Sequence, residues 1–414
     1  MEFGWPLRAK PLCLCVACAL PQLGLADVVD DSHLSLNIKN LYLNRNYTQD
    51  NAPVSKAGNW SQGFDLQFES GYTDTPLAVG LDLDGQYAVR LDSTGNDGSL
   101  PYSRHRQQTS DDYSRGGATL KFKYAKSVVK VGDQRPFYPV ASNDPSRQLD
   151  TIYQGAVIES RDIDKLTLVG GRFWSIVTRE SSNHERLYRF GTPDSQDSDG
   201  LDFAGATYAL TPDLQGSYFH GVLNDIYKQD YAGIKHTLRL ADGYQFKTDI
   251  GYFNNQEDGA ARSGPVDNRA YYGLVSVEKS GHTLGVVYQR MTGDTVFPTL
   301  NGYVPQLWLP NWGSIPFIRP DERSWSLRYG YNFAALGIPG LKLFTRYTKG
   351  TDIDRGADLD RDQESERDIM LNYVVQSGPL KDLAFDLKNM HTQQKYGADY
   401  DEYRLITSYT WKFW

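Results

Sequence analysis

Hydrophobic and polar residues alternate with the two-residue period of β-strands along most of this chain. The final segment, 403–414, carries one set of side chains on one face (Tyr403, Leu405, Thr407, Tyr409, Trp411 and Phe413) and a polar set on the other (Arg404, Ser408, Thr410 and Lys412). A strand with an apolar, aromatic face and a polar face separates lipid from water. The pattern therefore predicts a membrane-crossing strand at the end of the chain.

Similar segments recur earlier and are each about as long as one tilted membrane crossing. They begin at Leu34, Gly63, Thr119, Asp202, Tyr244, Ser324 and Leu341. Short connections such as 73–76, 211–213, 241–243 and 377–379 alternate with long polar ones. Short turns on one side and long loops on the other are typical of an outer-membrane barrel. We predict an all-β, antiparallel transmembrane β-barrel, and counting strands around the long connections gives 18.

Nine long connections are expected, at roughly 44–59, 92–115, 133–152, 175–200, 223–230, 254–268, 293–322, 349–367 and 391–401. Two of them, 133–151 and 293–323, combine Pro, Tyr and Phe, and the second also carries Trp. An 18-stranded barrel is too wide for side chains to fill, so selectivity needs a segment that folds inward. We expect these two loops to fold into the lumen; the alternative is that each packs on its own rim.

The N-terminal region has the features of a secretory signal. An apolar run, 11–25, follows Arg8 and Lys10 and is shorter than the ~20 residues of a spanning helix. We predict a signal peptide at 1–26 and one barrel domain at 27–414. All three cysteines lie inside the signal, so the exported chain would have no disulfide. A lipid anchor on Cys18 is the alternative.

Composition excludes several classes of protein. The net charge of -8 makes nucleic acid an unsuitable partner. Two soluble domains are an alternative by length, but the chain has no linker and no sustained helical periodicity. The seven histidines are scattered without a nucleophile or metal motif, which argues against an outer-membrane hydrolase and against a metal or other cofactor. A plugged receptor has no room for its plug, because strands begin at Leu34.

Four segments carry a family resemblance: DDYSRGGATLKFKYAKSVVKVGDQ from Asp111, GIPGLKLFTRYTKGTDID from Gly337, VVQSGPLKDLAF from Val374 and EYRLITSY from Glu402. The chain resembles the outer-membrane carboxylate channels, the substrate-specific porins typified by the imipenem and basic-amino-acid porin of pseudomonads. The resemblance implies a monomeric barrel in the outer membrane of a Gram-negative bacterium, narrowed by its third and seventh outer loops. It also implies a ladder of basic residues for small carboxylates, and we favour the branch that takes aromatic or cyclic acids.

Strand parity identifies candidates for this ladder independently of the family. In WSLRYG, Trp325, Leu327 and Tyr329 face lipid, so Arg328 faces the lumen. The same parity gives Lys39, Arg90, Lys121, Lys123, Lys130, Arg239, Lys342, Arg346, Lys388 and Arg404. Successive cations can replace the hydration of a carboxylate in a narrow pore. The alternative is that these are ordinary lumen charges paired with acids; Arg328 and Arg346, which also match the family pattern, favour the ladder.

Within the two unusual loops, the candidate constriction residues are Arg135, Tyr138, Ser146, Arg147, Trp308, Trp312 and Phe317. Only Ser146, Arg147 and the later Gly155 match the family's third-loop pattern. The expected partners are small carboxylate solutes, outer-membrane lipid and lipopolysaccharide, and the barrel-assembly machinery. A basic amino acid or peptide porin and a general diffusion porin remain alternatives, because sequence does not fix the position of the loops.

Overall fold

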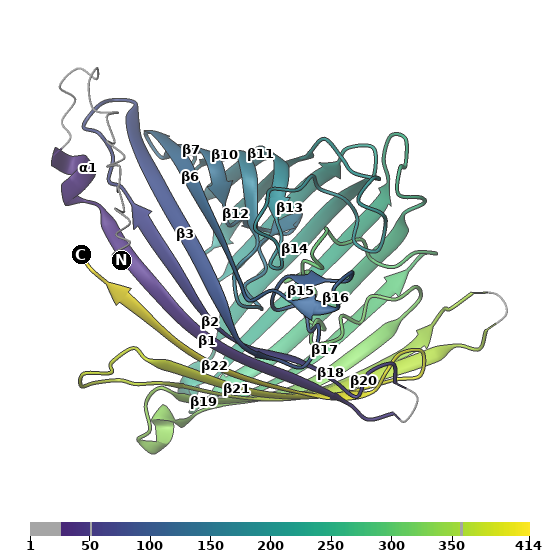
Figure 1. Cartoon of the computed structure of the whole chain (residues 1–414). Helices are drawn as coiled ribbons and strands as arrows, with labels where there is room; N and C mark the ends of the chain where they lie inside the picture. Colours follow the sequence, from purple (N-terminus) through teal and green to yellow (C-terminus); the bar gives the residue numbers. More distant parts are fainter. Residues whose placement is uncertain (1–25, 50–51, 357–358) are drawn as a thin grey trace, which may run out of the picture.

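The fold is a closed antiparallel β-barrel of 18 strands. The computed structural model describes residues 26–49, 52–356 and 359–414. Each strand pairs with its neighbours in the chain, and β1 (His33–Tyr47) also pairs with β22 (Tyr400–Lys412), which closes the sheet. Figure 1 shows this seam, where the purple first strand lies beside the yellow last strand. The predicted fold class and strand number are confirmed.

The remaining wall strands are β2 (Lys56–Glu69), β3 (Ala78–Ser93), β6 (Asp112–Tyr124), β7 (Ser127–Gln134), β10 (Ile152–Ser160), β11 (Leu166–Val177), β12 (Leu201–Thr211), β13 (Leu214–Leu223), β14 (Tyr227–Arg239), β15 (Gln245–Glu257), β16 (Asp267–Lys279), β17 (His282–Thr292), β18 (Arg323–Asn332), β19 (Leu341–Ile353), β20 (Asp362–Val374) and β21 (Ala384–Gln394). Over residues 26–49, 52–356 and 359–414 there are three short helices, α1 (Ala26–Asp30), η1 (Ala241–Gly243) and η2 (Phe333–Leu336). None of the described helices is long and apolar enough to cross a membrane.

Two sequence expectations are refined by these boundaries. The segment that begins at Thr119 is not one crossing: it divides into the end of β6 and the start of β7 at a tight turn, where Ala125 has a φ of 50°. The expected signal peptide, residues 1–26, lies outside the described residues except for Ala26, which begins α1. The boundary between signal and barrel domain stays a prediction.

Strand parity separates lipid from lumen as expected on β18. Trp325 and Leu327 are exposed on the outer surface, at 47% and 50%, whereas Ser324 and Ser326 face inward and are buried. Tyr347 on β19 and Leu371 on β20 are exposed on the same outer surface, because side chains alternate with the same two-residue period on the paired strands. The sequence alternation therefore defines the membrane surface of the barrel.

Three outer loops enter the lumen, which we call L3 (135–151), L4 (178–200) and L7 (293–322). L3 contains a small hairpin of β8 (Phe137–Tyr138) and β9 (Ala141–Ser142), and another hairpin, β4 (Tyr102–Ser103) with β5 (Gln108–Thr109), lies in the loop between β3 and β6. Gln306 of L7 donates from Nε2 to the carbonyl of Pro139 in L3 at 2.8 Å. L4 joins L7 through a bridge between Arg189 and Leu300. The loops thus form one connected insert.

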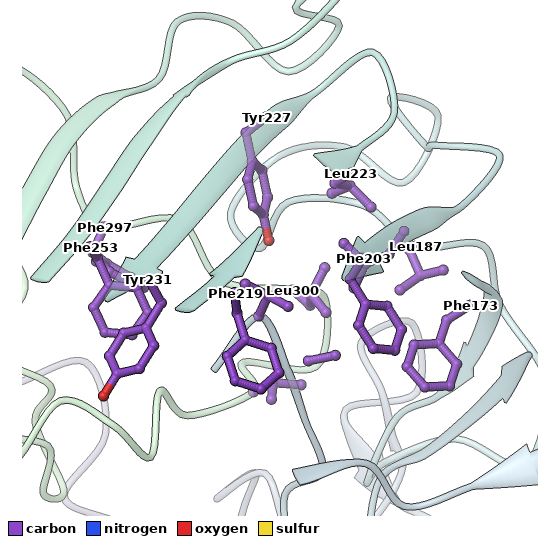
Figure 2. Close-up of a cluster of buried hydrophobic side chains, with 14 of the residues drawn as sticks. Phe173, Leu187, Phe203, Phe219, Leu223, Tyr227, Tyr231, Phe253, Phe297 and Leu300 are labelled. Atoms are coloured by element: carbon purple, nitrogen blue, oxygen red, sulfur yellow. The ribbon is translucent and has the colours of Figure 1, made fainter. Parts of the chain in front are cut away.

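An apolar cluster lies between this insert and one side of the wall. It contains lumen-side aromatic residues of β10–β16, including Tyr153, Phe173, Phe203, Phe219, Tyr231, Phe253 and Tyr272, and loop residues such as Val140, Leu187, Phe297 and Leu300. Figure 2 shows aromatic rings from the wall gathered with these loop side chains. The expectation that lumen-facing positions are polar is wrong here, because the loops exclude water and supply apolar partners. The apolar cluster therefore fills the lumen between this side of the wall and the insert.

Candidate functional site

Five of the predicted ladder cations lie close together on the wall opposite the apolar cluster. Arg328 on β18 is directly opposite Arg346 on β19, and Lys388 on β21 is directly opposite Arg404 on β22. Lys39 follows on β1, the next strand around the barrel. We call this set the basic arc. Its members come from strands far apart in the chain, and barrel closure brings them to one side of the lumen.

Arg346 is the most fully engaged member of the basic arc. It is 7% exposed, and its Nε lies 2.5 Å from Asp368 Oδ2 while its Nη2 lies 3.4 Å from Glu366 Oε1. Its Nη1 donates to the carbonyl of Trp312 in L7 at 3.2 Å. Arg346 therefore anchors L7 to the wall, and its role in solute passage stays a prediction.

Arg328 and Lys388 are less engaged. Arg328 donates from Nε to Ser326 Oγ at 3.2 Å and from Nη2 to the carbonyl of Pro310, and it forms no ion pair with the described carboxylates. The side chain of Lys388 forms neither a hydrogen bond nor an ion pair within the described part of the chain, and its electrostatic neighbours are Arg404, Asp386, Arg147 and Lys39. These two cations retain binding capacity for an anion in the lumen.

Arg404 belongs to a buried ion network that sequence parity alone did not identify. Glu402 is buried, and its Oε1 lies 2.5 Å from Arg404 Nη2 while its Oε2 pairs with Arg45. Arg45 also lies over the ring of Tyr400, 4.5 Å from its centroid. Two arginines share one carboxylate, so the network keeps a net positive charge beside Lys388.

L3 is fastened to the same wall. Lys39 Nζ donates to the carbonyl of Arg147 at 2.7 Å, and Gln148 accepts from Ser61 Oγ at 2.7 Å. Gly63 on β2 makes room for this contact, since a Cβ there would lie 2.0 Å from Gln148 Nε2. The sequence predicted neither Ser61 nor Gly63 as part of the constriction.

Arg147 places a further cation beside the basic arc. Burial, together with the charges of Arg404 and Arg179, lowers the pKa of Arg147 to about 9, so the side chain stays a cation at neutral pH. Its Nη1 donates to Ser146 Oγ at 3.2 Å, while its Nε is buried without a partner among the described residues. Tyr138, the other candidate in this stretch, packs instead in the apolar region, 5.5 Å from the ring of Phe203.

Arg135 lies among acids beside the Lys39 end of the basic arc, since Asp150 also lies 3.8 Å from Lys39 Nζ. Its Nη2 is 3.2 Å from Asp65 Oδ1 and 3.3 Å from Asp84 Oδ2, and its Nε is 4.0 Å from Asp150 Oδ2. One cation is thus shared among three carboxylates. The lumen beside L3 therefore carries both signs of charge.

The other predicted cations lie nearer the two mouths. Lys121 is buried and pairs with Asp82 at 2.6 Å, Arg90 pairs with Asp111, and Arg239 pairs with Asp213. Lys123, Lys130 and Lys342 are exposed, and they form no ion pair with described residues. The structure does not join these six residues to the basic arc, and a role for them in solute passage stays a prediction.

The aromatic candidates of L7 pack against protein. Trp308 lies 4.6 Å from the ring of Phe137 in L3, and Trp312 lies 5.8 Å from the ring of Tyr303. Phe317 is 1% exposed and packs with Tyr400. These residues shape the insert and hold it, rather than presenting open faces to a solute.

Two hollows in the lumen show where a solute has room. One, of about 370 Å³, is lined by Lys39, Asp65, Gln148, Asp150 and neighbouring polar residues. The other, of about 780 Å³, is lined by Lys130, Arg135, Asp84, Asp133 and Glu159 among others. Both border L3. Charged side chains of both signs line each of them.

Comparison with known proteins places this geometry in a family. The model of the outer membrane porin, OprD family, matches residues 26–413. The chain belongs to the OprD family of outer-membrane porins. This OprD-family chain is 33% identical to the porin-like protein GalP of Pseudomonas putida over 401 residues, which are 95% of each chain.

Solved structures agree with this assignment. OpdL of Pseudomonas aeruginosa is 44% identical, with a TM-score of 0.85, over 93% of this chain and 100% of that chain. OpdK of Pseudomonas aeruginosa, solved with vanillate, is 33% identical, with a TM-score of 0.88 and the same coverage. The protein is thus a substrate-specific porin of the outer membrane, and the family and the barrel indicate a channel rather than an enzyme.

Proposed function

We propose that this OprD-family porin takes up small carboxylate-bearing solutes by passive diffusion, with aromatic or cyclic acids favoured. The observation that carries the proposal is the basic arc beside L3, where Lys388 and Arg328 have no carboxylate partner among the described residues. Charge-assisted hydrogen bonds from such cations replace part of the hydration that a carboxylate loses in a narrow pore. Vanillate, present in the OpdK structure, is an aromatic carboxylate, which supports the same solute class.

The acids around Arg135 favour a second candidate. Asp65, Asp84 and Asp133 border the lumen hollows, so a solute that carries an amine as well as a carboxylate has a partner for each group. A basic amino acid fits this description. Monomeric assembly and insertion by the barrel-assembly machinery stay predictions from the resemblance.

The test is the reversal potential of single channels in a planar bilayer, with benzoate or arginine on one side. Replacing Lys388 with Gln should lower anion selectivity and benzoate flux, because the variant removes an unpaired cation from the basic arc. Lys228, whose neighbours Tyr227 and Gln229 face inward, is an outward-facing control: Lys228→Gln should leave both quantities unchanged. Equal benzoate flux in the Lys388→Gln and wild-type channels would reject the arc as the carboxylate path, and a preference for arginine would favour the second candidate.

A further inference from the structure

The outer ends of β16 to β20 carry a row of basic residues on the lipid-facing side of the barrel. Its members are Arg269, Arg290, Arg323, Lys349 and Arg367, one on each strand. Their immediate neighbours Asn268, Gln289, Ser324, Thr348 and Asp368 are buried toward the lumen, so strand alternation directs the five cations outward. We call them the outer basic row.

The height of this row follows from the aromatic residues beside it. Trp325 lies two residues below Arg323 on the same strand, and Tyr347 lies two residues below Lys349. The rings of Trp325 and Tyr347 are 5.9 Å apart on the exposed outer surface. Such aromatic girdles mark the boundary between hydrocarbon and headgroups. The row is therefore at the level of the headgroups in the outer leaflet.

Acidic partners within the protein only partly balance the row. Arg269 lies 3.1 Å from Asp267, and Arg323 Nε lies 3.5 Å from Asp352. By contrast, Arg290, Lys349 and Arg367 have no ion pair with a described carboxylate, and Arg367 donates only to the amide oxygen of Asn389, at 2.6 Å.

Arg290 is the least satisfied member of the row. It is directly opposite Arg323 in the ladder of β17 and β18, and like charges in that position repel. Its Nε is buried and has no hydrogen-bond partner among the described residues. An external anion beside the guanidinium groups of Arg290 and Arg323 would relieve this repulsion.

The outer basic row does not continue to β1 and β6. At the outer ends of β1 and β6, the outward positions hold Asn44, Asn46, Asp112 and Ser114, none of which is basic. General solubility does not require such an asymmetry. A one-sided cluster of cations at headgroup height is suited to a discrete anionic ligand.

A polar hollow of about 240 Å³ adjoins the row at Lys349. Its lining includes the amide side chains of Gln49, Gln363, Gln393 and Gln394, together with Lys395, Ser365, Glu364 and Asp399. Amide side chains both donate and accept hydrogen bonds, which matches the hydroxyl groups of sugars. A phospholipid has a small headgroup and needs no such hollow, whereas a phosphorylated glycolipid would use both features.

We propose that the outer basic row and the adjoining amide hollow bind one lipopolysaccharide molecule. The cations would hold its phosphates, Trp325 and Tyr347 would contact its acyl chains, and the amides would bond to its core sugars. Arginine and lysine recognise phosphate by charge-assisted hydrogen bonds, and basic sites on membrane proteins bind anionic lipid headgroups in this way. This surface is separate from the lumen, so the inference does not depend on the transported solute.

The experiment compares lipid binding to the full barrel and to a variant carrying Arg290→Gln, Lys349→Gln and Arg367→Gln. Native mass spectrometry and thermal unfolding in detergent would follow titration with purified lipopolysaccharide and, separately, with phosphatidylglycerol. Because each basic group near an anionic surface contributes severalfold, we expect lipopolysaccharide to bind on the order of 100-fold more weakly to the variant. A matched control replaces Arg172, Lys228 and Arg262 with Gln and should bind as the wild type does.

A folding control and a second variant separate a loss of lipopolysaccharide binding from a loss of the folded barrel. Single-channel conductance should be unchanged, which reports a folded barrel. A second variant, Gln363→Ala with Gln393→Ala, keeps every charge and should weaken lipopolysaccharide binding without changing that of phosphatidylglycerol. Undiminished lipopolysaccharide binding in both variants would overturn the proposal. Equal binding of phosphatidylglycerol and lipopolysaccharide, or a change only in oligomeric state, would instead assign the row to general phospholipid or to a second copy of the chain.

Discussion

The carboxylate of Glu366 on β20 fixes L7 inside the barrel, and its replacement by Gln gives a direct test of that arrangement. Glu366 is 1% exposed; its Oε1 accepts from the backbone N–H of Ser314 at 2.9 Å, and its Oε2 accepts from that of Ile315 at 2.7 Å. Arg346 holds the same carboxylate at 3.4 Å. Glutamine has the same shape, but it offers one acceptor oxygen in place of two.

The size of the effect follows from these contacts. One buried backbone N–H loses its acceptor and faces an amide group, which costs about 1–3 kcal/mol. The remaining bond no longer involves a charge and weakens by roughly 1 kcal/mol. Arg346 keeps Asp368 at 2.5 Å, so the wall itself stays paired. The seated state of L7 should lose roughly 2–4 kcal/mol, which raises the displaced population by a factor of about 30 to 1,000.

Single-channel recording measures this population, because a displaced L7 widens the pore and produces a larger conductance. We expect wide-state events to be far more frequent in Glu366→Gln than in the wild type. Glu278→Gln serves as the control, since Glu278 pairs with Lys247 at 2.7 Å near the other end of the wall. Heat-modifiable migration on a gel confirms barrel folding. Identical conductance records for Glu366→Gln and the wild type would refute the assigned role of this carboxylate.

Two further predictions concern pH and the apolar cluster. Burial and the neighbouring Glu364 raise the pKa of Glu322 in L7, so the seated loop favours the neutral carboxyl group. The seated loop is therefore most stable at acid pH, and this stabilisation is lost as the pH rises through the raised pKa of Glu322. Current noise in single-channel recordings should therefore increase with pH in the wild type but not in Glu322→Gln. The control Asp321→Asn, which changes the neighbouring acid, should behave as the wild type does. Equal pH dependence in all three proteins would contradict the role of Glu322. Phe253→Ala should lower the free energy of unfolding, followed by thermal unfolding, by about 3–5 kcal/mol, because Phe253 is fully buried. The lipid-facing control Phe246→Ala should lower the free energy of unfolding by less in the same assay. An equal loss in the two variants would show that the apolar cluster does not act as a core.

Alternation along the chain predicted the barrel because it is a local property of each strand. On β18 it assigned Trp325 and Leu327 to lipid and Arg328 to the lumen, and the strand has this arrangement. Alternation could not predict the apolar cluster. Phe253 follows the outward-facing Tyr252, so both faces of the strand are aromatic there, and alternation does not show whether a lumen-facing residue contacts water or an inserted loop. Consecutive aromatics on one strand were the available signal.

The positions of the candidate cations were predictable, but their partners were not. Parity identified Arg346 as a lumen-facing cation. Its partner Glu366 also binds backbone N–H groups of L7 that are 51 and 52 residues away in the chain, and no local sequence pattern encodes a contact over that separation. Likewise, Arg135 and Arg147 were both assigned to the constriction, yet only the folded loop shows that one lies among acids and the other among cations. Their contributions to solute passage remain predictions.

The apolar cluster has an electrical consequence for the pore. Hydrocarbon packed behind L3 and L7 polarises poorly, so it acts as an insulator along one side of the aqueous path. Field lines from the basic arc are then confined to the water and are less screened than they would be in a lumen filled with solvent. A few unpaired cations, Lys388 and Arg328 among them, can therefore set the ionic preference of a barrel whose overall charge is negative.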